Sequence, residues 1–271
     1  MSHGNDVFMM DDDARPLLLV TNDDGYGAPG LEAMVAALEA WATVLVIAPS
    51  HEKSACSHQL TLGRPLQRKK LGPHRYWVDG TPADCVYLGL LGGERVSPRI
   101  PDLVVSGLNA GLNLGLDTYY SGTVAGAREA AMRGVPGMAV SAEPGADGKR
   151  AAHLSSRLAW HFLQIFDRAE PVVLNVNIPA RGSWELRHTR LGRRVYGEGI
   201  EFRRSPRGRE YFWIGGAGVM KDECTPGTDT RALHEGAIGV TNLPLTPFDS
   251  RGDDIIDRMI RAWQAEQRSE R

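Results

Sequence analysis

Two adjacent carboxylates are the first feature of the sequence that could do chemistry. Asp23 and Asp24 lie in the segment TNDDGYGAPG, directly after an apolar run at residues 17–20. Adjacent carboxylates repel each other, which raises the pKa of one of them unless a cation neutralises the pair. Hard oxygen ligands of this kind suit Mg²⁺ or Mn²⁺. Asn, Asp and Gly are also ordinary turn residues, so this loop by itself slightly favours a simple turn before a helix.

A second polar loop, at residues 48–58, follows the next apolar run and carries Lys53 and Ser54. A serine hydroxyl can add a neutral oxygen to a hard cation, and a lysine can meet a phosphate as a point charge. A serine hydrolase fits less well, because the chain has no G-x-S-x-G motif and no orienting acid is evident beside the histidines. His51 and His58 are therefore interpreted as surface histidines.

The third polar segment, at residues 104–124, presents Asn109 and Asn113 among glycines. It ends in a Ser-Gly-Thr sequence made of Ser121, Gly122 and Thr123. Amide oxygens can bind a cation, and small hydroxyl residues at the start of a predicted helix can hold a phosphate against its backbone N–H groups. A long Asx-turn loop with a serine cap would explain the segment about equally well.

Apolar runs and helical spacing predict the elements that must position these loops. Buried strands are predicted at residues 17–20, 43–47, 103–105, 138–140 and 172–174. Helices are predicted after residue 30, from about residue 82, from 124 to 132 and from 151 to 166. Strands that alternate with helices predict a Rossmann-like α/β fold, a doubly wound and mainly parallel sheet in three α/β/α layers.

The common position of the three loops favours a binding site over three unrelated turns. Each loop follows a predicted parallel strand, and the carboxyl ends of such strands meet at one edge of the sheet, where ligands bind. A cation together with a phosphate explains all three loops. The cation would polarise a phosphoryl oxygen and lower the pKa of a bound water.

Composition excludes several classes of partner. With 31 Lys and Arg against 33 Asp and Glu, the formal net charge is −2, so no basic field is present to hold a long nucleic acid. The Arg-rich stretch at 187–209 is the local exception, interpreted as a solvated face in preference to an anion contact. Three cysteines without a CxxC pair, and no apolar run of about 20 residues, predict a cytoplasmic protein without a membrane span.

A change in composition beyond residue 180 predicts the domain organisation. Arg, Gly and aromatic residues replace the alternating pattern, and short strands are predicted at 210–214 and 237–240 in an antiparallel extension. The predicted units are a disordered leader at 1–15, a Rossmann-like catalytic core at 16–180, a β-rich oligomerisation extension at 181–248 and a C-terminal amphipathic helix at 249–271.

Taken together, these motifs resemble those of the SurE family, the survival-protein E type of 5′-nucleotidase. The resemblance covers most of residues 17–180 and is weaker toward the C-terminus. It is carried by N-D-D-G-x-x-A-P-G at 22–30, A-P-x-x-x-x-S at 48–54, G-T-P-A-D-C-V at 80–86, S-G-L-N-A-G at 106–111, Y-S-G-T-V at 120–124 and G-V-P at 134–136.

The resemblance implies a function and a set of site residues. It implies hydrolysis of nucleoside 5′-monophosphates to nucleoside and phosphate by a metal-activated water, with one Mg²⁺ or Mn²⁺ per subunit. It implies a homodimer or homotetramer joined through the C-terminal extension. The implied metal ligands are Asp23, Asp24, Ser54 and Asn109, with Asp23 and Asn109 as catalytic candidates. The implied substrate contacts are Asn113, Ser121, Gly122 and Thr123.

Other functions remain open at the level of the sequence. A nucleotide-sensing module would bind without turnover, and a broad-specificity acid phosphatase or exopolyphosphatase would accept other substrates. A haloacid-dehalogenase type of phosphatase requires D-x-D after the first strand, whereas Asp23 and Asp24 are adjacent. Asp84 is interpreted as a first-turn helix carboxylate. Tyr119 and Tyr120 could stack on a base or pack against the protein, with about equal support.

Overall fold

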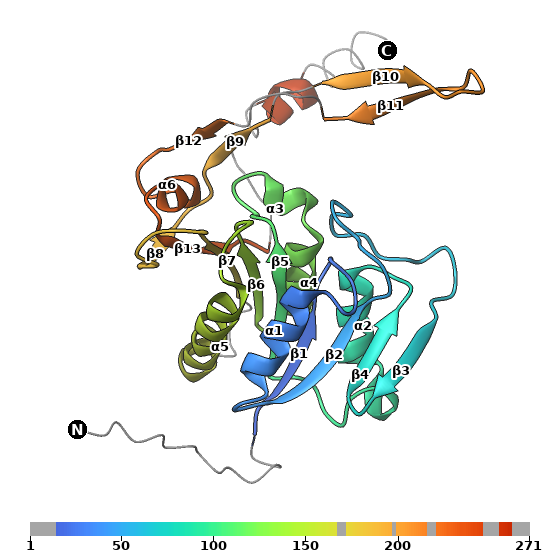
Figure 1. The fold of residues 1–271 in the computed structure, drawn as a ribbon, viewed down its shortest axis with the longest axis vertical. Coiled ribbons are helices and arrows are strands. Elements are labelled where there is room, and N and C mark those ends of the chain that lie inside the picture. Colours follow the sequence, from blue (N-terminus) through green and yellow to red (C-terminus); the bar gives the residue numbers. More distant parts are fainter. Residues whose placement is uncertain (1–14, 167–171, 197–198, 216–220, 246–254, 262–271) are drawn as a thin grey trace.

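A nine-stranded sheet forms the centre of the molecule, as described by a computed structural model for residues 15–166, 172–196, 199–215, 221–245 and 255–261 (Figure 1). The strand order is β3-β4-β2-β1-β5-β6-β7-β13-β8. The strands are β1 Leu17–Thr21, β2 Thr43–Pro49, β3 Arg68–Gly72, β4 Arg75–Val78, β5 Leu103–Ala110, β6 Gly137–Ala142, β7 Val173–Ile178, β8 Leu186–Thr189 and β13 Ile238–Leu243.

The six strands from β4 to β7 in this order run parallel to one another. β3 pairs with β4 in the antiparallel sense, and β13 pairs antiparallel with β7. The five strands that the apolar runs predict are β1, β2, β5, β6 and β7. The prediction of a doubly wound, mainly parallel sheet is therefore confirmed.

Helices cover both faces of the sheet and complete the three layers. α1 and α5 pack together on one face, and α2 and α4 pack together on the other. The helices are α1 Pro29–Leu38, α2 Pro82–Leu91, α3 Asp117–Tyr120, α4 Gly122–Met132, α5 Gly148–Ile165 and α6 Asp229–His234, with a 3₁₀ turn η2 at Gly93–Arg95. In α2, Asp84 accepts from the Thr81 backbone N–H and Thr81 caps the helix, which matches the first-turn role predicted for this carboxylate.

The continuous apolar run of β1 has a direct structural reason. Leu18 and Val20 face the cluster that includes α1 and α5, whereas Leu17 and Leu19 face the cluster that includes α2. A strand covered on both faces needs apolar side chains on both faces, and β1 supplies them at residues 17–20 before the buried Thr21 at its end. Burial of this strand fixes the point at which the polar loop with Asp23 begins.

The chain beyond residue 180 differs in part from the expected separate extension. β8 and β13 belong to the central sheet, because β13 pairs with β7 and β8 pairs with β13. The strand predicted at 237–240 thus lies inside the core sheet, where it covers the edge of β7. The segment between β8 and β13 forms two smaller ribbons, made by β9 Arg193–Val195 with β12 Lys221–Glu223 and by β10 Ile200–Arg204 with β11 Glu210–Ile214.

Figure 1 shows these ribbons leading away from the sheet, with the β10–β11 hairpin at the far end of the molecule. The predicted leader falls almost entirely outside the described residues. Of the predicted C-terminal helix, residues 255–261 are helical, and the remainder lies outside the described part of the chain. Among the helices that the structure describes, none has the length and apolar character needed to cross a membrane.

Candidate functional site

A cavity of about 510 Å³ opens at the carboxyl edge of the parallel strands. Its walls come from the loops after β1 and β2, from the end of β5 and the loop after it, from α3 and the start of α4, and from the residue that follows β9. The lining residues are Asp23, Asp24, Glu52, Ser54, Ala55, Asn109, Ala110, Leu112, Asn113, Asp117, Tyr120, Ser121 and Tyr196. All four residues expected as metal ligands therefore share one cavity, as their positions after successive strands predict.

Asp23 is the more buried of the paired carboxylates, at 4% exposure. Its two oxygens accept from the Thr123 hydroxyl at 2.5 Å and from the Thr123 backbone N–H at 3.0 Å. Burial raises the pKa of the Asp23 carboxyl and the charge of Asp24 raises it further, although the bonds from Thr123 act in the opposite direction. The protein thus holds a carboxylate at fixed geometry in surroundings that disfavour its charge.

Asp24 is held more loosely at the same edge. One of its oxygens, Oδ2, accepts from the backbone N–H of Ala110 at 3.2 Å, which joins the β1 loop to the end of β5. Burial raises the pKa of Asp24, and the neighbouring carboxylate of Glu52 raises it as well. Three like charges therefore meet at the cavity, an arrangement that a cation would relieve.

Ser54 and Asn109 supply the neutral oxygens. The Ser54 hydroxyl donates to Glu52 at 2.8 Å, so its lone pairs remain for an electrophile. The Asn109 side-chain amide donates to the backbone oxygen of Gly111 at 3.0 Å, which leaves its carbonyl oxygen as the atom for a ligand. Two carboxylates, a hydroxyl and an amide oxygen form an all-oxygen donor set that fits Mg²⁺ or Mn²⁺.

A metal site built only from acidic, histidine and cysteine side chains is not formed in the part of the chain that the structure describes. A cation at this cavity would therefore depend on the neutral oxygens of Ser54 and Asn109 in addition to the two aspartates. The donor chemistry fits a hard divalent ion and does not fit a soft, thiolate-bound one. Cys56 is nearby, but burial and the charge of Asp23 raise the pKa of its thiol to about 11.

The residues expected to contact phosphate are divided by the structure. Ser121 and Asn113 line the cavity. Thr123 is fully buried, and both its hydroxyl and its N–H are bonded to Asp23. Gly122 makes this contact possible, because a Cβ atom there would lie 2.9 Å from the Asp23 Cβ. The start of α4 thus packs directly against the carboxylate loop. Thr123 is bonded to Asp23 and is not free to contact a phosphate through these groups.

Asn113 has a fixed position at the back of the cavity. Its backbone N–H donates to Asn177 at 2.8 Å and its side-chain amide donates to Ser141 at 2.7 Å. Its backbone oxygen accepts from Asn175 at 2.8 Å and from Asn177 at 3.0 Å. Strands β6 and β7 therefore set the course of the third motif loop through buried polar side chains.

The loop that carries Ser54 is attached to α4 by a histidine. His58 was expected at the surface, but its Nε2 lies 2.8 Å from the carboxylate of Glu129, whose side chain is 1% exposed. Arg133 also donates to Glu129, and these bonds lower the pKa of that carboxyl despite its burial. His51, in contrast, is exposed as expected. The sequence gives no local signal for the His58 contact, because Glu129 lies 71 residues away.

Glu52, Asp117 and Tyr196 line the cavity although the motifs did not single them out. Glu52 and Asp117 fall inside the polar motif segments, so their position could have been found by counting every carboxylate there. Tyr196 comes from the extension, which lies close to the third motif loop, since a Cβ on Gly115 would lie 2.6 Å from the Gly192 oxygen. Such a contact between distant segments leaves no local pattern.

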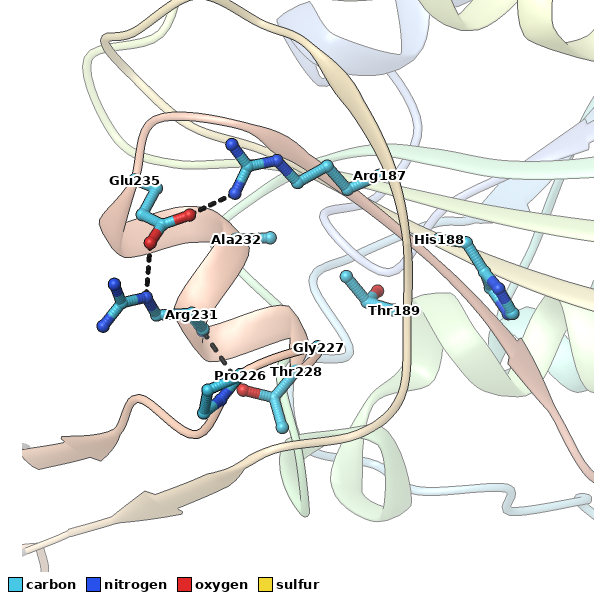
Figure 2. A pocket seen from close by; sticks show the side chains of 9 residues that line it. All are labelled: Arg187, His188, Thr189, Pro226, Gly227, Thr228, Arg231, Ala232 and Glu235. Carbon is cyan, nitrogen blue, oxygen red and sulfur yellow. Dashed lines mark hydrogen bonds and ion pairs between the residues drawn. The ribbon is translucent and has the colours of Figure 1, made fainter.

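A second pocket, of about 180 Å³, lies between β8 and α6 (Figure 2). Arg187 and Arg231 both point to Glu235 and pair with it. Arg187 also pairs with Glu185, so two carboxylates balance the two guanidinium charges within the protein. The lining residues share none with the carboxylate cavity, so the chemistry suggested by the motifs belongs to the first cavity.

A parallel sheet with helices on both faces and an oxygen-lined cavity at its carboxyl edge defines a doubly wound α/β protein with a ligand site at the strand ends. The particular family follows from comparison with known proteins. The chain belongs to the SurE family, since the family model described as survival protein SurE matches residues 18–198.

Relatives and a solved structure agree with this assignment. The 5′-nucleotidase SurE of Sorangium cellulosum (strain So ce56) is 52% identical over 244 residues, which cover 89% of this chain and 94% of the relative. The 5′-nucleotidase SurE of Syntrophotalea carbinolica is 43% identical over 248 residues, covering 89% and 96%. The crystal structure of the SurE protein from Aquifex aeolicus has a TM-score of 0.76 at 35% identity and covers 90% of this chain and 99% of that one.

Proposed function

We propose that this chain is a 5′-nucleotidase that releases phosphate from nucleoside 5′-monophosphates with one divalent cation, Mg²⁺ or Mn²⁺, held by Asp23, Asp24, Ser54 and Asn109. The observation that carries the proposal is the convergence of these four oxygen donors on one cavity. The relatives named 5′-nucleotidase SurE support a nucleotide phosphomonoesterase. The names of these relatives do not mention a metal, so we propose the cation and its ligands from the cavity itself.

The side chains of the cavity suit this reaction in distinct ways. A bound divalent cation would supply Lewis acidity, which polarises a phosphoryl oxygen and lowers the pKa of water. We assign to the Asp23 carboxylate the removal of the proton from the attacking water, because its two bonds from Thr123 hold it at a fixed position in the cavity. Asn109 would act through the cation, which its carbonyl oxygen would help to hold, since its amide is bonded to Gly111.

The start of α4 would hold the phosphate. The N–H of Thr123 donates to Asp23 and that of Val124 donates to the Ser121 oxygen. We therefore assign the phosphate contacts at this helix start to the Ser121 hydroxyl and the Gly122 N–H, together with Asn113, which lines the same cavity. Thr123 would contribute through Asp23, which it orients.

Release of phosphate is the direct test. The purified chain with Mn²⁺ or Mg²⁺ should release inorganic phosphate from a panel of nucleoside monophosphates, and a chelator should abolish the release. Equal turnover of polyphosphate or simple phosphomonoesters would instead indicate a broad-specificity phosphatase or exopolyphosphatase. Nucleotide binding with no turnover under any metal condition would indicate a sensing module and contradict the proposal.

Divalent cation should also stabilise the fold. At a cation concentration of about 100 times Kd, binding adds about 2.7 kcal/mol to the free energy of unfolding, or an increase in Tm of about 5 to 10 °C for a domain of this size. Thermal unfolding with Mn²⁺, Mg²⁺ and K⁺ measures the effect, and K⁺ serves as the control. An equal shift with K⁺ would mean that general screening, and not a built site, is responsible.

The pH dependence of this stabilisation follows from the carboxyl pKa values. Because burial raises the pKa of Asp23 and Asp24 in the cation-free protein, the folded state binds protons more tightly than the unfolded chain. Their contribution to stability is thus present below the unfolded pKa and is lost as the pH rises through the raised values. The gain from cation should be largest at about pH 7.5 and should shrink toward about pH 5, where protons compete for the same oxygens.

We propose that the extension joins subunits into a homodimer or homotetramer. The β10–β11 hairpin exposes large apolar side chains on a two-stranded ribbon that has little core of its own. These residues are Ile200, Phe202, Tyr211, Phe212, Trp213 and Ile214. The molar mass from light scattering should be that of an oligomer, and Phe212→Glu should reduce this mass. Leu62→Glu, at an exposed leucine outside the extension, should leave the mass unchanged. An oligomer unaffected by Phe212→Glu would exclude the hairpin as the contact.

A cytoplasmic location remains part of the proposal. The three cysteines, Cys56, Cys85 and Cys224, are free thiols, which suits a reducing compartment.

A further inference from the structure

The cavity with the proposed metal ligands has aromatic side chains on its wall. Tyr120 of α3 and Tyr196, directly after β9, both line it, and they are 65% and 51% exposed. Tyr119 is 58% exposed but lies outside the lining. A tyrosine that served only to pack the wall would be covered by its neighbours. The rings of Tyr120 and Tyr196 are instead open to whatever occupies the cavity.

Tyr196 is the more rigidly held of the two. Its hydroxyl lies beside Asp117 and Arg194, and burial together with the Asp117 carboxylate raises the pKa of this hydroxyl to about 12. The Arg194 guanidinium reaches Asp117 at 3.5 Å and makes two bonds to Asp222, at 2.8 and 3.0 Å. Arg194 is itself buried, so the network has a fixed base. The ring is thus held by strand β9 at one end and by the Asp117–Arg194 pair at the other, which reduces the entropy cost of stacking a ligand on it.

The dimensions and chemistry of the cavity match a ligand with two different ends. A volume of about 510 Å³ exceeds what an inorganic phosphate needs and falls in the range of sites for small organic ligands. The oxygen donors after β1, β2 and β5 suit a phosphate with a cation. Tyrosine rings suit a planar aromatic group, and stacking tolerates any base because every base has a π face.

We propose that Tyr196 stacks on the base of the bound nucleoside 5′-monophosphate and makes this site prefer nucleotides to other phosphomonoesters. The inference rests on the proposed function, because it assigns a further part of the same cavity. Asp117 and Arg194 are positioning residues in this scheme, since they hold the Tyr196 hydroxyl. The extension beyond residue 180 therefore contributes to substrate selection through the residue after β9.

The test compares a substrate with a base and one without. For Tyr196→Ala, KM for AMP should rise about tenfold with kcat nearly unchanged, while kcat/KM for glycerol 3-phosphate should stay at the value of the unsubstituted enzyme. Tyr196→Phe keeps the ring and loses only its tether, so KM for AMP should rise less than about threefold. Tyr119→Ala is the matched control, and it should change neither substrate.

Two results would overturn the inference. An equal loss for AMP and glycerol 3-phosphate would show that Tyr196 supports the site in general, and no loss for either would show that the base lies elsewhere. Should the unsubstituted chain hydrolyse neither substrate, the proposed function fails separately. Calorimetric titration with AMP and Mn²⁺ then decides the inference, because Tyr196→Ala must weaken AMP binding about tenfold, and an unchanged Kd contradicts it.

Discussion

Asp24→Asn is expected to reduce phosphate release from nucleoside monophosphates by about 100-fold or more, because it removes one of the two charged ligands proposed for the cation. The substitution is close to isosteric. The Asn carbonyl oxygen can still accept from Ala110, as Asp24 Oδ2 does at 3.2 Å. The loss should therefore come from the charge at the cavity and not from the course of the loop.

The same variant should be at least as stable as the unsubstituted protein without cation. Burial and the charge of Glu52 raise the pKa of Asp24, so ionised Asp24 costs stability that a neutral amide does not. The increase in Tm produced by Mn²⁺ should be largely lost. Activity and unfolding with and without Mn²⁺ measure the three effects together.

Glu52→Gln is the matched control, because Glu52 lines the same cavity and the Gln oxygen can still accept from Ser54. It is not one of the proposed ligands, so the loss of activity should stay below about tenfold and the Mn²⁺ effect on Tm should remain. Equal losses for Asp24→Asn and Glu52→Gln would mean that the cavity responds to total charge, and the proposed ligand set would be wrong.

Asp229→Ala should lower the free energy of unfolding more than the other substitutions proposed above. Asp229 is 1% exposed and accepts from three backbone N–H groups, those of Gly115 at 2.9 Å, Gly192 at 2.6 Å and Thr230 at 2.8 Å. Each buried N–H left without an acceptor costs about 1 to 3 kcal/mol. We expect a loss of about 4 kcal/mol in the free energy of unfolding, measured by urea denaturation.

Asp229→Asn separates the stability effect from the effect on the site. Oδ1 accepts from Gly192 and Thr230, and an Asn carbonyl can keep both bonds. Oδ2 accepts from Gly115, so the Asn side-chain NH₂ would face a backbone N–H in the loop that leads to the cavity. We expect a loss of about 2 kcal/mol together with lower activity. Glu94→Gln, at an exposed carboxylate of the η2 turn that does not line the cavity, should leave both unchanged. An Asp229→Asn variant with normal activity would show that Gly115 does not influence the site.

The sequence was informative where burial or chemistry acts locally. β1, β2 and β5 to β7 could be predicted because strands covered on both faces need unbroken apolar runs. β3, at Arg68 to Gly72, was missed because three of its five residues are charged and the strand lies at an exposed edge. β10 was missed for a similar reason, since every residue from Ile200 to Arg204 is exposed and no core imposes a pattern on it.

The cavity shows the same division. The four donors expected for the cation could be placed on one edge because Asp23, Asp24 and Ser54 follow β1 and β2, and Asn109 lies at the carboxyl end of β5. The contact of His58 with Glu129 and the position of Tyr196 could not, because both join segments that are distant in the chain. Thr123 was predicted to contact phosphate, but in the structure its hydroxyl donates to Asp23. Only the folded structure shows how closely α4 approaches Asp23.

The position of β8 and β13 in the central sheet changes how the molecule can be divided. The ribbons between them form an insertion with both ends rooted in the core, and not a tail attached at one end. A fragment ending near residue 180 would lose β13 and leave β7 as a bare edge of five buried residues and one half-buried residue. Such an edge invites pairing with other chains. A smaller version of this protein should therefore be made by shortening the insertion and joining β8 to β13 through a short loop, so that β13 is retained.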